Sequence, residues 1–321
     1  LLLLGLLFFL PVLLDRGKRI RYAAGALVVG GGITAAYGIF YYGNDPSTRL
    51  GGFVGNYMST GGILMMISLV AFSLLFHRRV GGALPWIAGL LLPVLLAALY
   101  LTDTRGAWLG LLGGLLALVL LVRRRLVLIP ILLLAVLLAF PGKPRDTALS
   151  AVRPDHPRNR ERLFMWKAGI EIFRDHPWTG VGLAGMREIY ADYQDPDSEE
   201  RAVHLHSVPI QVLASMGILG FAAWVYLFGS LLLWLLRAHG KSRDGRPVFR
   251  ALTAGAVAVW TGFVLNGFVE WNLGDVEVIT LLWAVMGLAV SSAGAARAVS
   301  PDGAAGRSKG AGPSPGTGPS V

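Results

Sequence analysis

The sequence predicts an all-α protein, a polytopic bundle of transmembrane helices with one long loop outside the membrane. Hydrophobic residues make up 54% of the 321 residues and charged residues only 15%, whereas about a quarter of the residues in soluble domains are charged. Several apolar runs have about 20 residues, the length that crosses a bilayer. Because these runs are continuously apolar and do not alternate with polar residues, they favour helices over the strands of a barrel.

Nine apolar runs are candidate membrane helices. They are residues 1–14, 22–42, 57–76, 82–101, 106–122, 126–141, 207–236, 251–268 and 277–295. The first run has neither the basic lead nor the cleavage site of a signal peptide, so we expect it to be the end of an incomplete span.

The chain is therefore expected to have four parts. Spans one to six occupy residues 1–141, and an extracytoplasmic loop carrying amphipathic helices occupies residues 142–206. Spans seven to nine occupy residues 207–295. Residues 296–321 are rich in Gly, Pro and Ser, which predicts a disordered cytoplasmic tail.

The basic residues indicate which loops face the cytoplasm. Loops 15–21, 77–81, 123–125 and 237–250 hold 14 Lys and Arg residues, and loops 43–56, 102–105 and 268–276 hold two. The two sets alternate along the chain, and basic short loops stay in the cytoplasm, so the second set lies outside. Long loops cross regardless of charge, which places 142–206 outside as well. The net charge of +10 thus indicates topology and not a nucleic-acid partner.

Arg105 lies in an outer turn, in the stretch "LTDTRGAWLG" at 101–110. Arg49 and Arg105 are the two basic residues of the short outer loops. An arginine at a helix end can serve as an anchor that extends to the membrane surface. It can also bind an anion, and both roles stay open for Arg105.

His206 stands at the start of the stretch "HSVPIQVLASMGILG". Ser207 can cap the helix that follows, and Pro209 is tolerated in its first turn. The positive end of the helix dipole favours a neutral imidazole, which a general base needs. The alternative is a boundary histidine that hydrogen-bonds headgroups or backbone. His204 and His206 alone, with no third His or Cys nearby, are a weak metal pattern, so we expect no metal and no cofactor.

Two further segments contribute candidate residues. Trp166 lies on the apolar face of an amphipathic helix of membrane-surface type. Glu270, in "VEWNLGD" at 269–275, is expected at an outer helix end. It can hold an arginine, contact sugar hydroxyls or simply be solvated.

Together these motifs resemble the O-antigen ligase / O-antigen polymerase family of bacterial membrane glycosyltransferases. "HSVPIQVLASMGILG" fits the family's H-[NSQ]-x9-G-x-x-G pattern, and "TDTRGAWLG" is similar to its T-x-S-R-G-A-W-L turn, with Thr104 in place of serine. "RLFMWKAGIEIFRDHPWTGVG" is similar to its R-x3-W … P-x-x-G-x-G loop. The resemblance covers about residues 100–225.

The resemblance implies transfer of a glycan from a polyprenyl-diphosphate-linked donor to an acceptor hydroxyl, on the extracytoplasmic face of the bacterial cytoplasmic membrane. It implies that His206 activates the acceptor and that Arg105 and Arg162 bind the diphosphate. Because a diphosphate is already an activated leaving group and no Asp/Glu cluster suggests a metal, we expect direct displacement with inversion and without a metal. Arg49, Trp166, His204 and Glu270 are expected to contact substrate. The expected partners are this donor, the lipid bilayer and an acceptor that is a glycan, a lipid or a protein.

Three alternatives stay open. A polysaccharide polymerase and a protein O-oligosaccharyltransferase of the same family differ from a ligase only in the acceptor. A polysaccharide transporter or flippase is the alternative of another class. Transporters favour inverted repeats and polar groups at mid-membrane, whereas the distinctive polar residues here fall at the outer ends of the runs.

Overall fold

The computed structural model describes residues 4–14, 17–44, 49–139, 143–151, 153–199, 204–241 and 247–297. These residues form helices and no strand, which confirms the all-α prediction. The predicted tail falls almost wholly outside the described residues.

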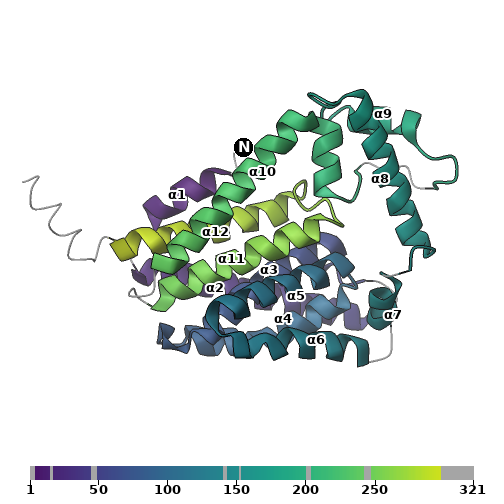
Figure 1. The fold of residues 1–321 in the computed structure, drawn as a ribbon. Coiled ribbons are helices and arrows are strands. Elements are labelled where there is room, and N and C mark those ends of the chain that lie inside the picture. The colour runs from purple at the N-terminus through teal and green to yellow at the C-terminus, as the bar shows by residue number, and fades with distance from the viewer. Residues whose placement is uncertain are drawn as a thin grey trace, which may run out of the picture.

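The helices follow one another along the chain in the order in which they are labelled in Figure 1. They are α1 Gly5–Leu13, α2 Gly17–Asn44, α3 Tyr57–Phe76, α4 Leu84–Leu101, α5 Arg105–Val122, α6 Leu128–Ala139, α7 Lys143–Ser150, α8 Pro157–Asp175, α9 Met186–Tyr193, α10 Val208–Lys241, α11 Pro247–Gly267 and α12 Val276–Arg297. Short 3-10 turns join some of them, at Gly52–Val54, Arg78–Val80 and Arg124–Val127.

Seven of the described helices are long and apolar enough to cross a membrane: α2, α3, α4, α5, α10, α11 and α12. The chain is thus a multi-pass membrane protein, with a span count below the predicted nine. The runs 1–14 and 126–141 form the shorter helices α1 and α6, of 9 and 12 residues. Twelve residues rise about 18 Å, less than the roughly 30 Å of a hydrocarbon core. Apolar composition alone does not fix where a helix begins. In the run 126–141, a 3-10 turn takes the place of the first helical residues.

Glycines bring α5 and α11 into close contact at the centre of the bundle. Gly106, Gly110 and Gly114 repeat every four residues along one face of α5. A Cβ on Gly262 of α11 would lie 2.8 Å from the carbonyl oxygen of Gly110. Small residues at this spacing let membrane helices approach backbone to backbone. A Cβ on Gly106 would lie 3.0 Å from the side chain of Glu270, so the contact brings the start of α5 to the loop after α11.

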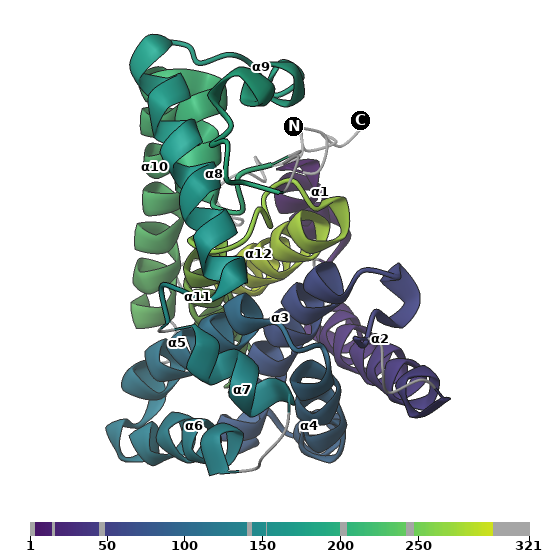
Figure 2. The same ribbon diagram turned by 90° about the vertical axis from the view of Figure 1, so that its right-hand side faces the viewer.

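The two predicted sets of loops lie at opposite ends of the bundle. His77, Arg123 and Arg250, from three of the basic loops, are close enough to interact electrostatically. At the other end, α8 crosses over the ends of the membrane helices, with α9 and α7 at either end of it (Figure 2). The sparsely basic loops, 43–56, 102–105 and 268–276, meet beneath α8.

A sharp kink at Gly217 divides α10, next to α9 (Figure 1). Gly217 has φ 63° and ψ −167°, a conformation that is essentially limited to glycine. The loop 176–182 fills the break: Val181 and Gly182 donate to the carbonyls of Ala214 and Ser215, at 3.1 and 2.8 Å. Beyond the kink, the amide of Ile218 donates to the carbonyl of Pro177 at 2.8 Å.

This geometry explains why glycines recur in the two motifs. A Cβ on Gly217 would overlap the backbone of Trp178, and a Cβ on Gly180 would overlap the backbone of Ser215. The P-x-x-G-x-G loop and the helix after His206 are therefore two halves of one backbone junction, which fixes α8 relative to α10.

We expect Gly217→Ala to destabilise the protein. A side chain in this conformation costs about 1–3 kcal/mol, and the overlap with Trp178 adds to that cost. The melting temperature in detergent should fall by about 5 °C or more. Gly229→Ala is the matched control. Gly229 lies on the same helix as Gly217, and a Cβ added there would meet nothing within 4 Å. Equal melting temperatures for the two variants would contradict the junction.

Candidate active site

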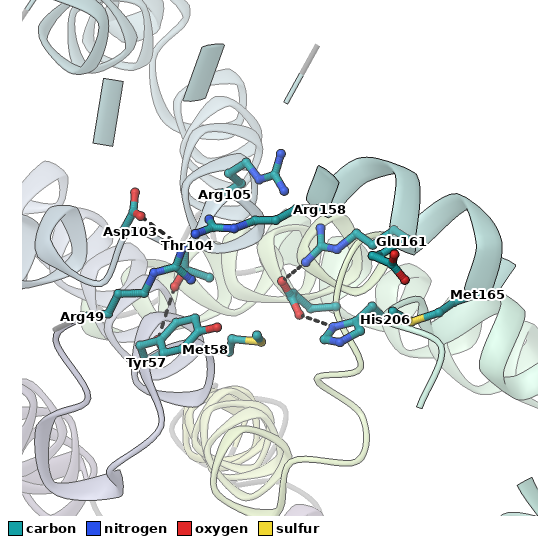
Figure 3. A pocket seen from close by; sticks show the side chains of 12 residues that line it. Arg49, Tyr57, Met58, Asp103, Thr104, Arg105, Arg158, Glu161, Met165 and His206 are labelled. Carbon is teal, nitrogen blue, oxygen red and sulfur yellow. Dashed lines mark hydrogen bonds and ion pairs between the residues drawn. The ribbon is translucent and has the colours of Figure 1, made fainter. Parts of the chain in front are cut away.

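A polar cavity of about 130 Å³ lies beneath α8, at the end of the bundle where the sparsely basic loops meet. Its walls come from five segments that are far apart in the sequence, and Figure 3 shows side chains from them facing one another. The lining residues are Arg49, Tyr57, Met58, Asp103, Thr104, Arg105, Arg158, Glu161, Arg162, Met165, His206 and Glu270.

His206 is held in place by its backbone neighbour Leu205. The indole Nε1 of Trp166 donates to the carbonyl of Leu205 at 3.1 Å, and the amide of Leu205 donates to Oε1 of Gln211 at 2.8 Å. His206 itself has a positive φ of 46°, which turns the chain between Leu205 and the helix. The carbonyl of Ser207 accepts from the amide of Gln211, as expected of the residue that precedes the first turn.

Glu270 joins two of the predicted site residues. Its Oε1 accepts from Nη2 of Arg162 at 2.5 Å, and its Oε2 lies 3.1 Å from Nδ1 of His206. Burial of Glu270 by itself would raise the pKa of the carboxyl, but the hydrogen bond from His206 and the charge of Arg162 lower it below its usual value. The carboxylate therefore stabilises the fold at neutral pH, and that contribution is lost as the pH falls through the lowered pKa.

This contact also sets the tautomer of His206. A carboxylate can only accept hydrogen bonds, so Nδ1 of His206 carries the proton. In the neutral ring, Nε2 is then unprotonated and is free to accept a proton. An imidazole that is oriented by a carboxylate in this way is a suitable general base.

Arg105 is held by neutral groups. Its Nη1 donates to Oδ1 of Asn159 at 2.7 Å and contacts Oγ of Ser150 at 3.4 Å. The amide group of Asn159 donates in turn to the carbonyls of Ser150 and Arg153, each at 2.7 Å. The guanidinium is thus fixed in position and keeps its full positive charge for a ligand.

Arg49 is held by a carboxylate and an aromatic ring. Its Nη2 lies 3.3 Å from Oδ2 of Asp103, and its guanidinium carbon lies 4.5 Å from the centre of the Tyr57 ring. The amide of Leu50 also donates to the carbonyl of Leu101. These contacts join the loop before α3 to the turn before Arg105.

A larger apolar cavity, of about 650 Å³, lies between α4, α5 and α6. Trp108, one helical turn after Arg105, lines it together with Tyr100, whose ring stacks on Trp108 at 6.4 Å between centres. Leucines of all three helices complete the wall, among them Leu96, Leu112, Leu133 and Leu137. An apolar cavity thus lies next to the helix turn that begins at Arg105.

Residues 89–225 match the model of a protein family described as O-antigen ligase. This part of the chain is similar to the O-antigen ligase family. The match confirms the resemblance that the motifs indicated, and it includes Arg105, Arg162 and His206. Arg49 and Glu270 lie outside the matched region. No curated protein matches the chain.

Five of the seven predicted site residues line the polar cavity and two do not. Arg49, Arg105, Arg162, His206 and Glu270 surround it.

Trp166 and His204 lie behind the cavity wall. Trp166 packs in a small core under α8 and positions Leu205. The ring of His204 lies edge-on against that of His206, with 4.3 Å between centres. Its burial and the neighbouring His206 lower the pKa of His204 to about 4, so it is neutral at physiological pH.

Sequence reasoning did not single out Arg158, Glu161 or Asn159. Arg158 and Arg162 lie four residues apart, so they occupy the same face of α8, and this spacing could have identified Arg158. The role of Asn159 had no sequence signal because its partners, Arg105 and Ser150, lie on other helices. Among the described residues, no three His, Asp or Glu side chains are grouped as metal ligands would be.

We expect Glu270→Leu to reduce the free energy of unfolding by about 3 kcal/mol, because it leaves Arg162 in the wall without its carboxylate. Unfolding by sodium dodecyl sulfate in mixed micelles measures this free energy. The double variant Arg162→Leu/Glu270→Leu should lose less than the sum of the two single variants.

The exposed ion pair of Arg160 and Asp197 provides the control for that measurement. Its nitrogen and oxygen are 3.7 Å apart and both side chains are more than half exposed, so Asp197→Leu should leave the stability nearly unchanged. Additive losses at Arg162 and Glu270 would show that these two residues do not form an energetic unit.

Proposed function

We propose that this protein transfers a glycan from a polyprenyl diphosphate to an acceptor hydroxyl, on the extracytoplasmic face of a bacterial cytoplasmic membrane. The observation that carries the proposal is the unit formed by Glu270, Arg162 and His206, in a cavity that also contains Arg105. It provides an oriented base beside fixed positive charge, at the end of a membrane bundle.

Glycan transfer needs both the oriented base and the fixed positive charge. The acceptor oxygen attacks the anomeric carbon of the donor sugar while the bond from that carbon to the diphosphate oxygen breaks. Nε2 of His206 takes the proton of the acceptor hydroxyl, and Glu270 stabilises the imidazolium that forms. The diphosphate leaves with the electron pair of the broken bond, and guanidinium groups offset its charge with paired hydrogen bonds. Direct displacement inverts the anomeric configuration.

Arg105 and Arg162 contact the diphosphate in this scheme. Arg105 has the stronger claim, because its structural partners are neutral. Arg162 directs one nitrogen to Glu270 and is also among the residues that line the cavity. The polyprenyl chain fits the apolar cavity between α4, α5 and α6, which begins one turn from Arg105.

The position of the polar residues favours an enzyme over a transporter. The ionisable groups of the cavity lie at helix ends and in loops, not at the middle of the spans, whereas transporters bind substrate near mid-membrane.

A ligase, a polymerase and a protein O-oligosaccharyltransferase share this step and differ in the acceptor. Sizing the lipid-linked glycans of cells without the protein distinguishes them. Single repeat units accumulate when a polymerase is missing, and long polymers on lipid accumulate when a ligase is missing. Glycoproteins disappear when a protein glycosyltransferase is missing.

We expect His206→Ala to reduce kcat for glycan transfer by about 10²–10⁴-fold, because it removes the general base. Donor binding should be nearly unchanged, since the arginines stay in place. The measurement uses purified protein with a synthetic polyprenyl-diphosphate sugar and candidate acceptors.

His176→Ala is the control for this experiment because His176 is an exposed histidine of the same loop region, outside the cavity. It should transfer at the normal rate. A normal rate for His206→Ala as well would disprove the mechanism.

A further inference from the structure

Arg158 is a basic residue of the polar cavity that lies outside the motifs shared with the family. It lies on α8, one turn before Arg162, and lines the cavity. Its side chain extends from α8 across the cavity toward Thr104 (Figure 3). Within the described part of the chain, it makes no hydrogen bond and no ion pair.

The carboxylates at the cavity are engaged by other groups. Asp103 pairs with Arg49, and Glu270 pairs with Arg162. Glu161 faces the segment that follows α9, where it accepts from Oγ of Ser198 at 2.7 Å and from the amide of Glu199.

Two of the four guanidinium groups that line the cavity therefore have no carboxylate partner among the described residues. Arg105 has only the neutral partners Asn159 and Ser150, and Arg158 has none. The charges of Arg158 and Arg162 act on Arg105, so these cations are close enough to repel one another. A bound anion relieves that repulsion, and guanidinium groups match phosphate oxygens in geometry.

We propose that Arg158 binds the diphosphate of the donor, and that Arg105 and Arg158 form a two-guanidinium clamp with one guanidinium for each phosphate group. Arg158 then determines specificity, because a carrier with a single phosphate occupies only one half of the clamp. The proposal rests on the proposed function in that the diphosphate belongs to the glycan donor.

Arg160 provides the matched control. It lies on α8 two residues from Arg158 and carries the same charge, but it faces away from the cavity. Its guanidinium pairs with Asp197 at 3.7 Å and lies 5.4 Å from the centre of the Phe164 ring.

The test measures the binding of inorganic pyrophosphate and of inorganic phosphate to the purified full chain in detergent, for the wild type, Arg158→Gln and Arg160→Gln. We expect the wild type to prefer pyrophosphate. Arg158→Gln should lower the affinity for pyrophosphate about tenfold and leave the affinity for phosphate nearly unchanged, since one charge-assisted contact is lost. Arg160→Gln should keep the full preference.

Arg158→Lys refines the test. Lysine keeps the charge but not the paired hydrogen bonds of a guanidinium, so it should recover only part of the preference. An unchanged preference in Arg158→Gln, or an equal loss in Arg160→Gln, would overturn the clamp. Size-exclusion elution and helix content must match the wild type for the comparison to count.

This result is independent of the transfer assay. Pyrophosphate binding needs neither acceptor nor His206, so a normal transfer rate in His206→Ala would remove the proposed mechanism and leave the clamp standing. Conversely, an unchanged preference in Arg158→Gln would remove the clamp and leave the role of His206 intact.

Discussion

The carboxylate of Glu270 is the contact on which the rest of the site depends. It is almost fully buried, a position that a charge occupies only when it is paired and hydrogen-bonded. Arg162 satisfies one oxygen and His206 the other. The three residues come from α8, the turn before α10 and the loop after α11. One buried negative charge thus ties α8 to the membrane bundle and orients the imidazole of His206 at the same time.

Two backbone contacts bring these segments close enough for that interaction. Gly110 and Gly262 let α5 and α11 touch, which brings the turn with Arg105 to the loop of Glu270. The kink at Gly217 accepts the loop 176–182, which fixes α8 against α10. Each contact leaves no room for a Cβ. Glycine is therefore needed for approach in the first case and for both approach and conformation in the second.

The arginines of the cavity differ in whether a carboxylate pairs with them. Arg49 and Arg162 each pair with a carboxylate, that of Asp103 and that of Glu270. Arg105 is fixed by neutral acceptors, which hold its geometry without cancelling its charge. Fixed positive charge of this kind favours an anionic ligand, because the charge is already in position and needs no reorganisation. The apolar cavity beside it suits a ligand that is charged at one end and hydrocarbon at the other.

The sequence by itself determined the helical class, the separation of the loops into two sets, and the motifs around Arg105, Arg162 and His206. These follow from composition and from short-range patterns, which need no knowledge of packing. Only the tertiary structure decided that α6 is too short to match a full span, that Trp166 and His204 support the cavity wall, and that Glu270 pairs with His206. It also revealed Arg158 and Asn159, because the neighbours of a side chain on α8 depend on how that helix lies across the bundle. Contacts between residues 64 or 108 positions apart, such as those of Glu270, depend on the packing of whole helices, and no local pattern encodes them.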